Sequence, residues 1–442
     1  MATGAFWSAV PGSGGGGCIG NVCGGGLYGL PSWPRAEHLE LGFEQLDSKG
    51  ISMAKLRFGY FIAPFHRAGT NPTLALQRDL EFIQHLDALG FDEVWLGEHH
   101  SAGSEIISSP EIFIAAAAER AKRIRFGTGV ISLAYHNPLW VADRLMLLDH
   151  LTHGRVIGGV GPGSLPTDSA MIGLNPTDTR ELLEINLDIV VRLLAGETVS
   201  AKTATHQLFD ARLQLAPYSD GGIPLAVAAV ASPTGARLAG KHGIGLLSIG
   251  ATLTIEGFNA LSYHWGIVEE RAAAFGTQVD RKNWSLVGPF HIAETYEQAR
   301  ADVKFGIEPW FRYFQRVAAF PQMTMPGERL DEMIDIINDN GVGVIGTPER
   351  ARAQVQRLWD QSGGFGCMLQ MGHEWANPAA TKRSAELFAA EVMPHFQGQA
   401  QPTLDAAARA SQVRDDLAQT QLQAIEHMTK KYESEKRPTN TG

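Results

Sequence analysis

The stretch GFDEVWLGEHH, residues 90–100, decides the fold that we predict for this chain. A short apolar strand occupies its centre, and an acid and two imidazoles, Glu98, His99 and His100, follow at the end of that strand. Apolar residues recur at helical spacing over residues 71–90, immediately before the strand, and a second helical pattern follows over residues 109–123. A buried strand between two amphipathic helices is typical of a repeated βα unit.

The same alternation of strand and helix continues along the chain. Helical patterns lie between most of the segments that we predict to be strands. Besides residues 92–98, the eight predicted strands comprise residues 56–63, 124–133, 154–161, 223–230, 244–251, 285–294 and 366–374. Eight strands with crossover helices predict an α/β fold, a closed (β/α)8 TIM barrel, rather than an open sheet.

Composition divides the chain into three parts. Residues 1–52 are rich in glycine, have no apolar period and do not resemble a signal peptide, so we expect a disordered leader. Residues 53–397 form the predicted barrel domain, and residues 398–442 form a polar, helix-prone tail. The segment of about 253–344 is long for two or three barrel elements and rich in aromatic residues and methionine. It is either an inserted helical pair that covers one end of the barrel or a mobile lid over an apolar ligand.

Charge and cysteine content limit the functions that we consider. The net charge is −10 and the lysines and arginines are scattered, so no basic patch predicts binding to nucleic acid or to an anionic membrane. No apolar run reaches the roughly 18 residues of a membrane span. The three cysteines are widely spread, which argues against a disulfide scaffold and a zinc site and favours a reducing cytoplasm.

The residues at the end of the second strand are the candidate catalytic groups. Reactive side chains of such barrels gather at the carboxyl ends of the strands, where Glu98, His99 and His100 lie. Adjacent side chains on an extended backbone point to opposite sides, so we expect at most one of the two histidines to face the barrel mouth. A structural role and a catalytic role stay equally open for this pair. Neighbouring imidazoles on one strand do not converge on one ion, so we predict no metal.

Two further patterns suit a bound ring and a bound phosphate. Gly127 and Gly129 interrupt the third strand, where either a flat ring lies against the backbone or the barrel has a bulge. After the fifth strand, Ser232 is placed to cap a helix and Thr234 adds a hydroxyl, which makes either a phosphate site or only a cap. The segment GGVGPG, residues 158–163, fails the dinucleotide-binding spacing, and neither a Walker motif nor a G-x-S-x-G motif is present.

Five segments together resemble the bacterial luciferase-like flavin monooxygenases. They are GFDEVWLGEHH, residues 127–163, ASPTGA, GTPERA and residues 363–396. The last segment is especially similar to the branch of limonene 1,2-monooxygenases and diketocamphane monooxygenases. The resemblance covers roughly residues 56–396, and the order of the five segments is specific for the family but not for a substrate.

The resemblance implies a flavin at the barrel mouth. The flavin is usually FMN, with FAD as the alternative, and a separate reductase reduces it with NAD(P)H. Its ring would lie near the peptide between Gly129 and Val130, which is a cis peptide in relatives. Its phosphate would meet Ala231, Ser232 and Thr234.

The resemblance also implies roles for the residues after the second strand. His99 matches the catalytic histidine of the family. Glu98 and His100 would orient the strand end and the ring of His99. Asp168 falls where the family has an acidic residue near the flavin.

The chain departs from the family pattern at two places near the phosphate. Relatives carry an arginine in the loop after the fourth strand, where residues 161–163 read Gly-Pro-Gly here. Relatives also carry an acid where Ala231 stands. These differences leave the strength of flavin binding, and the choice between FMN and FAD, open.

The implied reaction inserts one oxygen atom from O2 into a small lipophilic substrate. The reduced flavin adds O2 at C4a, and the C4a-peroxyflavin needs shelter from water, for which the aromatic and Met side chains of residues 311–325 are suited. A protonated peroxide is electrophilic and epoxidises an alkene, whereas its anion is nucleophilic and oxygenates a ketone. A histidine titrates near neutral pH, so we expect His99 to control that proton.

Other functions stay open on the same fold. A dehydrogenase could use deazaflavin F420 or FMN for hydride transfer without oxygen, and some relatives are thought to bind flavin without catalysis. A metal-dependent hydrolase is a more distant alternative. The expected partners are a lipophilic small molecule and a flavin reductase, and frequent dimerisation in the family makes a homodimer a further expectation.

Overall fold

Eight parallel strands form a closed barrel in the part of the chain that the structure, a computed structural model, describes: residues 55–62, 65–230, 232–249, 261–319 and 324–436. Around the barrel they are β1 Arg57–Ile62, β2 Glu93–Leu96, β3 Arg125–Thr128, β5 Val156–Gly161, β8 Leu225–Ala229, β9 Gly245–Ser248, β10 Trp284–Ile292 and β12 Cys367–Met371. The barrel closes where β12 pairs with β1. The (β/α)8 barrel that the sequence predicts is therefore confirmed, and each strand lies within its predicted segment or one residue outside it.

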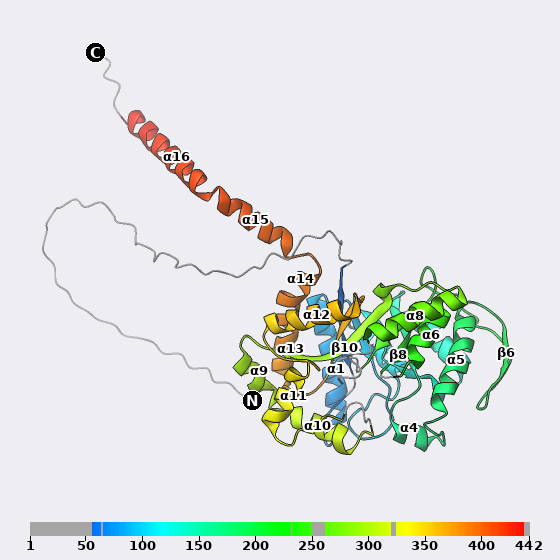
Figure 1. Ribbon diagram of the computed structural model, residues 1–442. Helices are drawn as coiled ribbons and strands as arrows, with labels where there is room; N and C mark the ends of the chain where they lie inside the picture. The colour runs from blue at the N-terminus through cyan, green and yellow to red at the C-terminus, as the bar shows by residue number, and fades with distance from the viewer. Residues whose placement is uncertain (1–54, 63–64, 231, 250–260, 320–323, 437–442) are drawn as a thin grey trace, which may run out of the picture. The chain divides into compact units, whose positions relative to one another are not determined.

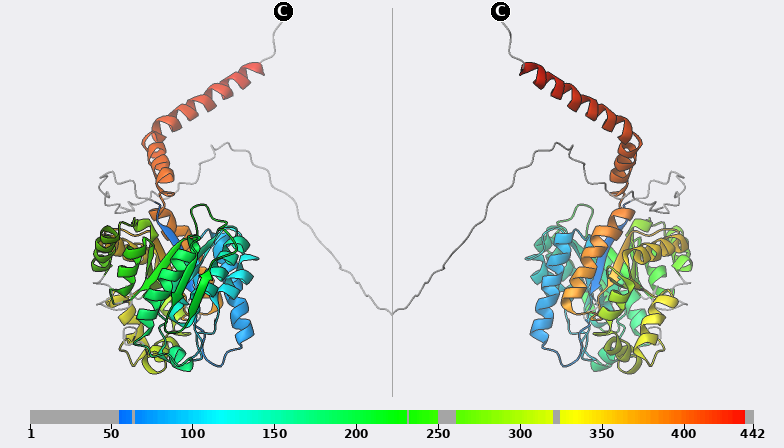
Figure 2. Two further views of the ribbon diagram at one scale, coloured as in Figure 1. Left: turned by 90° about the vertical axis from the view of Figure 1, so that its right-hand side faces the viewer. Right: turned by 90° about the vertical axis from the view of Figure 1, so that its left-hand side faces the viewer.

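Helices surround these strands on the outside of the barrel (Figures 1 and 2). The helices that follow successive barrel strands are α1 Pro72–Leu89, α2 Pro110–Ala118, α3 Pro138–Thr152, α5 Thr179–Leu194, α6 Thr234–His242, α8 Leu261–Phe275, α12 Pro348–Ser362 and α13 Pro378–Leu387. A short helix, α4 Pro166–Met171, precedes α5. A π-helical turn, Phe388–Val392, and α14 Met393–Phe396 extend α13.

A repeated Asn-Pro or Ser-Pro pair begins four of these helices. The side chains of Asn71, Asn137 and Asn377 accept hydrogen bonds from backbone amides in the first turn of α1, α3 and α13, and Ser109 does the same for α2. Proline follows each of these residues and has no amide hydrogen that would need a partner. The local sequence alone therefore determines where these helices start.

An additional segment outside the barrel lies between β10 and α12. It contains α9 Tyr296–Val303, α10 Ile307–Arg316, α11 Leu330–Asp339 and a short strand, β11 Val344–Gly346, which pairs with the end of β10. Within the insertion expected at residues 253–344, the structure places two barrel elements, α8 and β10, before these helices. Among the described residues of this segment, the additional helices therefore follow β10.

Three short strands accompany the barrel: one lies within the segment predicted as the third strand, and two lie outside the predicted strands. Strand β4, Ile131–Ser132, pairs with the end of β5, and β6 Val199–Lys202 forms an antiparallel hairpin with β7 Gln207–Ala211.

The tail contains two helices, α15 Gln401–Gln412 and α16 Arg414–Glu435, which are exposed along their length. No helix among the described residues is both long and apolar enough to cross a bilayer. The expected leader, residues 1–52, lies outside the described residues.

The interior of the barrel is organised around the indole of Trp95 on β2, which is 2% exposed. A methyl group added to Gly127 of β3 or to Gly159 of β5 would overlap this ring. The indole Nε1 donates a hydrogen bond to Oε2 of Glu93 at 2.9 Å, and Oε1 of that carboxylate accepts one from Nε of Arg57 at 2.8 Å. The group that packs against Gly127 is therefore Trp95 rather than a ligand ring. The pairing of β3 with β2 is regular there, but the register with β5 shifts by one residue between Gly127 and Ile131, as the bulge alternative expects.

The contact between Trp95 and Gly127 makes a stability prediction. We expect Gly127→Ala to lower the free energy of unfolding by about 1–3 kcal/mol, because the new methyl group has no space beside the indole. The matched control is Gly266→Ala in α8, where nothing lies within 4 Å of the added methyl group. Alanine favours a helix over glycine by roughly 0.5–1 kcal/mol, so the control should be stabilised. Urea unfolding followed by circular dichroism measures both, and shifts of the same sign in the two variants would contradict this packing.

Candidate active site

A cavity of about 420 Å³ opens at the carboxyl ends of the barrel strands. Its volume lies within the roughly 300–1,000 Å³ that is typical of small-molecule sites. The predicted site residues that line it are Glu98, His99, Gly129, Val130, Ser232 and Thr234. His100 and Asp168 lie behind this wall, and Ala231 lies outside the described residues.

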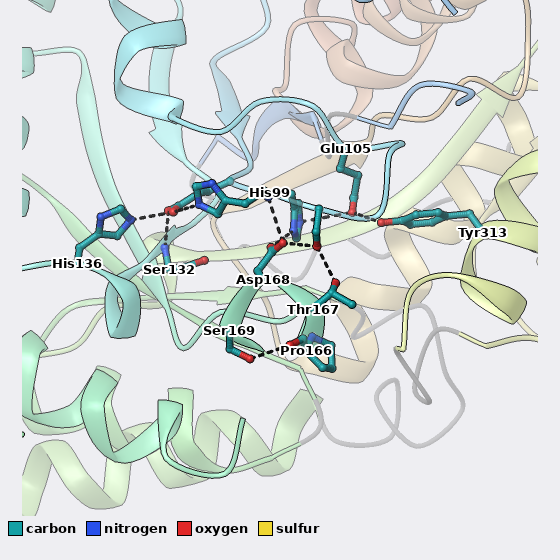
Figure 3. A network of polar contacts seen from close by, with 12 residues as sticks. His99, Glu105, Ser132, His136, Pro166, Thr167, Asp168, Ser169 and Tyr313 are labelled. Carbon is teal, nitrogen blue, oxygen red and sulfur yellow. Dashed lines mark hydrogen bonds and ion pairs between the residues drawn. The ribbon is translucent and has the colours of Figure 1, made fainter. Parts of the chain in front are cut away.

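The side chain of His99 contributes to the cavity wall, and two carboxylates flank its ring (Figure 3). Its Nδ1 lies 3.4 Å from Oδ2 of Asp168, and its Nε2 lies 3.6 Å from Oε2 of Glu105. Burial alone would lower the pKa of His99, but the negative charges of Glu105 and Asp168 outweigh it and raise the pKa above its ordinary value. The two carboxylates therefore stabilise the imidazolium form of His99.

His100 points the other way, as the alternation along an extended backbone requires. Its Nε2 donates a hydrogen bond to Oε1 of Glu98 at 2.8 Å, and Nε2 of His136 donates to the same oxygen at 2.7 Å. The amide of Ser132 donates to Oε2 at 2.7 Å. Burial would raise the pKa of Glu98, but these bonds lower it to about 2. A permanently charged carboxylate thus joins the end of β2 to the segment that follows β3.

Asp168 lies in the first turn of α4 and connects that helix to the loop after β2. Its carboxylate accepts hydrogen bonds from the hydroxyl of Ser101 and from the amide of His100, the latter at 3.2 Å. Burial would raise the pKa of Asp168, but its bonds to His99 and Ser101 lower the pKa below its ordinary value. Asp168 itself does not line the cavity, and it influences the cavity through its contact with His99.

The backbone at Gly129 and Val130 forms another part of the wall. The peptide between them is cis, the form that the family resemblance implies. A methyl group on Gly129 would lie 2.8 Å from Cε2 of Phe61 and 3.1 Å from Cβ of Trp95. Only glycine therefore fits between these side chains while its backbone borders the cavity.

The start of α6 differs from the sequence-based expectation. The helix begins at Thr234 after the N-cap residue Pro233, and no side chain caps it. The expectation that Ser232 caps this helix is therefore wrong. Ser232, Thr234 and Gly235 instead line the cavity, where the first amides of a helix attract anions.

Arg180 lines the same cavity from the first turn of α5. The chain lacks the arginine that relatives carry at residues 161–163, and Arg180 was not among the predicted site residues. No local pattern could have indicated it, because the starts of α5 and α6 line one cavity only in the closed barrel.

Helix α10 covers the cavity with aromatic side chains. Trp310 and Phe314 line the cavity, and Trp310 packs edge-on against Trp375 with ring centroids 5.2 Å apart. Tyr313 donates its hydroxyl hydrogen to Oε2 of Glu105 at 2.7 Å. Glu105 was also missed, since a single acid within the loop after β2 carries no periodic signal. Among the described residues, no group of His, Cys, Asp and Glu has the arrangement of a metal site.

Comparison with known proteins agrees with this geometry. Residues 56–365 match the family model described as Luciferase-like monooxygenase. Limonene 1,2-monooxygenase from Rhodococcus erythropolis is 48% identical over 386 residues, which cover 86% of this chain and 97% of the relative. The 4-hydroxyprotoasukamycin monooxygenase of Streptomyces nodosus subsp. asukaensis is 42% identical over 351 residues, 78% of this chain and 94% of the relative.

A solved structure shows the same fold. The oxygenating constituent of 3,6-diketocamphane monooxygenase from Pseudomonas putida is 24% identical, superposes with a TM-score of 0.64 and covers 77% of this chain and 99% of its own. The family model matches more than half of the chain, and two curated relatives match nearly their full length. The chain therefore belongs to the luciferase-like monooxygenase family, which confirms the sequence-based expectation of a flavin-dependent monooxygenase.

Proposed function

We propose that this protein binds reduced FMN, supplied by a separate reductase that uses NAD(P)H, and transfers one oxygen atom from O2 to a lipophilic alkene. The observation that carries the proposal is the imidazole of His99, flanked by two carboxylates, in the wall of a cavity that aromatic side chains of α10 cover. The relative with 48% identity is named for limonene, an alkene, and the solved diketocamphane enzyme is in complex with FMN.

The residues around the cavity fit FMN. The backbone of Gly129 and Val130 would hold the ring, since the absence of a side chain at Gly129 leaves the backbone accessible. The hydroxyls of Ser232 and Thr234 and the first amides of α6 would hold the phosphate. Arg180 supplies a cation at this end, in place of the arginine that residues 161–163 lack.

When bound, reduced FMN activates O2 for transfer to the substrate. The chain's own contribution is to exclude water and to control one proton. Trp310 and Phe314 cover the cavity with apolar surface, which protects a reactive oxygen species from water. His99 holds a proton that it can donate by a hydrogen bond to the oxygen that is transferred.

The raised pKa of His99 favours an alkene over a ketone as substrate. An oxygen that carries a proton is electrophilic and attacks a carbon–carbon double bond, whereas an unprotonated one is nucleophilic and attacks a carbonyl carbon. Glu105 and Asp168 stabilise the acidic form of His99, so the site can supply the proton. The products would be an epoxide, water and oxidised FMN.

The role of His99 predicts a change in how O2 is used. We expect His99→Ala to retain the fold and FMN binding but to lower the rate of product formation by about 10²-fold or more, the usual loss when a general acid is removed. The O2 that is consumed should then appear as hydrogen peroxide. In the wild type, product formed per O2 should also fall as pH rises through the pKa of His99, because only the imidazolium can donate.

The measurement combines an oxygen electrode, a peroxide assay and product mass. His85→Ala in α1 is the matched control, because His85 pairs with Glu386 on the outside of the barrel. An unchanged ratio of product to peroxide in His99→Ala would refute the proton-donor role.

Arg180 predicts a phosphate-specific effect on binding. Replacing it with glutamine should weaken FMN binding by about tenfold or more, since hydrogen bonds to charged groups contribute about 1.5–3 kcal/mol. Riboflavin lacks the phosphate, so its affinity should not change. Arg192→Gln is the control, because Arg192 is on the same helix and pairs with Glu197. Fluorescence titration with both flavins tests this, and an equal loss for FMN and riboflavin would contradict the assignment.

One competing function has support from the fold. An F420-dependent secondary alcohol dehydrogenase shares it, with a TM-score of 0.58 at 18% identity. The decisive experiment is anaerobic titration with reduced FMN, followed by pulses of O2 with a panel of alkenes and ketones. O2 consumption with an epoxide product supports the proposal. Reduction of F420 by an alcohol without O2 uptake, or flavin retention without turnover, would overturn it.

A further inference from the structure

Glu105 is held in a fixed position beside the cavity. It forms an isolated antiparallel bridge with Phe65, and the amide of His66 donates to the carbonyl of Ser104 at 2.7 Å. On the other side, the amide of His99 donates to the carbonyl of Ile107 at 3.0 Å. The loop after β2 is therefore attached both to the segment after β1 and to the catalytic strand end, so the carboxylate of Glu105 has little freedom to turn away.

A single oxygen of Glu105 lies between the proposed proton donor and the covering helix. Oε2 of Glu105 lies 3.6 Å from Nε2 of His99 and accepts the hydroxyl hydrogen of Tyr313 at 2.7 Å (Figure 3). Both Glu105 and Tyr313 are buried, at 6% and 4% exposure. The ring of Phe65 packs edge-on against Tyr313 with centroids 5.4 Å apart, which orients the phenol. The contact thus links residues from α10 and from the loop after β2.

We infer that Glu105 and Tyr313 are positioning residues for His99. Through them, the affinity of His99 for its proton depends on the position of α10 over the cavity. This inference rests on the proposed function. Neither residue needs to touch the substrate or the flavin for this role. They act through His99, whose side chain contributes to the cavity wall.

The direction of the effect follows from the charges around His99. The groups that face it are Asp168 from α4, Glu105 from its own loop, the neighbouring Glu98 and His100, and the phenol of Tyr313 from α10. The carboxylate of Glu105 stabilises the imidazolium. The hydroxyl of Tyr313 also donates a hydrogen bond to that carboxylate and stabilises its negative charge. The carboxylate then attracts the imidazolium of His99 less strongly. With α10 in place, His99 therefore gives up its proton more readily.

Two substitutions should move the titration of His99 in opposite directions. Glu105→Gln removes the negative charge and should lower the pKa of His99 by about one unit or more. Tyr313→Phe removes only the hydroxyl and leaves Glu105 more dependent on the imidazolium, so the pKa should rise by roughly half a unit, about threefold in proton affinity. In the double variant, the effect of Tyr313→Phe should vanish, because the carboxylate through which it acts is gone.

The test is NMR titration of the histidine ring signals in the flavin-free protein, with His99 identified by the signal that His99→Asn removes. Tyr60→Phe is the matched control: Tyr60 is a buried tyrosine of β1 that packs on Phe82 and Phe91, and its loss of a hydroxyl should leave the titration unchanged. If Glu105→Gln does not fold, the upward shift in Tyr313→Phe still decides the matter.

This test separates the inference from the proposed function, because it needs no turnover. Shifts in the predicted directions that disappear in the double variant support the coupling. No shift in Tyr313→Phe, or the same shift with and without Glu105, would overturn it. Turnover assays of the wild type judge the proposed function independently. If the wild type forms product, the pH at which product per O2 falls should be about half a unit higher in Tyr313→Phe, because His99 then keeps its proton to higher pH.

Discussion

The ionised carboxylate of Glu98 is the constraint on which the site depends. It is almost completely buried, and it accepts hydrogen bonds from His100, His136 and the amide of Ser132. A buried charge is stable only when it is hydrogen-bonded, and here the three donors lower its pKa to about 2. With the end of β2 held in this way and His100 turned toward Glu98, the side chain of His99 is left to face the cavity.

The barrel interior supports this arrangement from within. Trp95, three residues before Glu98, fills the space that Gly127 and Gly159 leave, and its indole is anchored by Glu93. Large and small side chains on neighbouring strands thus complement each other, as close packing requires. The packed strand fixes the position of His99, and Glu105 and Tyr313 connect it to the covering helix α10.

Local sequence patterns predicted the barrel well and its short strands poorly. The barrel strands are largely buried and apolar, so they stand out as short continuous apolar runs. The Asn-Pro pairs mark helix starts through hydrogen bonds made within a few residues. The hairpin of β6 and β7 was missed because most of its residues are exposed and its pattern is mixed. Ser232 was wrongly expected to cap α6, since a Ser-Pro pair does not show whether the helix starts after the serine or after the proline.

The sequence by itself determined the fold class, the family and the position of His99 at a strand end, because these depend on periodicity and on segments that are continuous in the chain. Only the tertiary structure decided what surrounds that histidine. Tyr313 meets Glu105 across 208 positions of sequence, and Arg180 lines the same cavity as the start of α6 only because the barrel brings consecutive βα units side by side. Such arrangements leave no local pattern, since each partner is an ordinary residue of its own segment until the closed barrel brings the partners together.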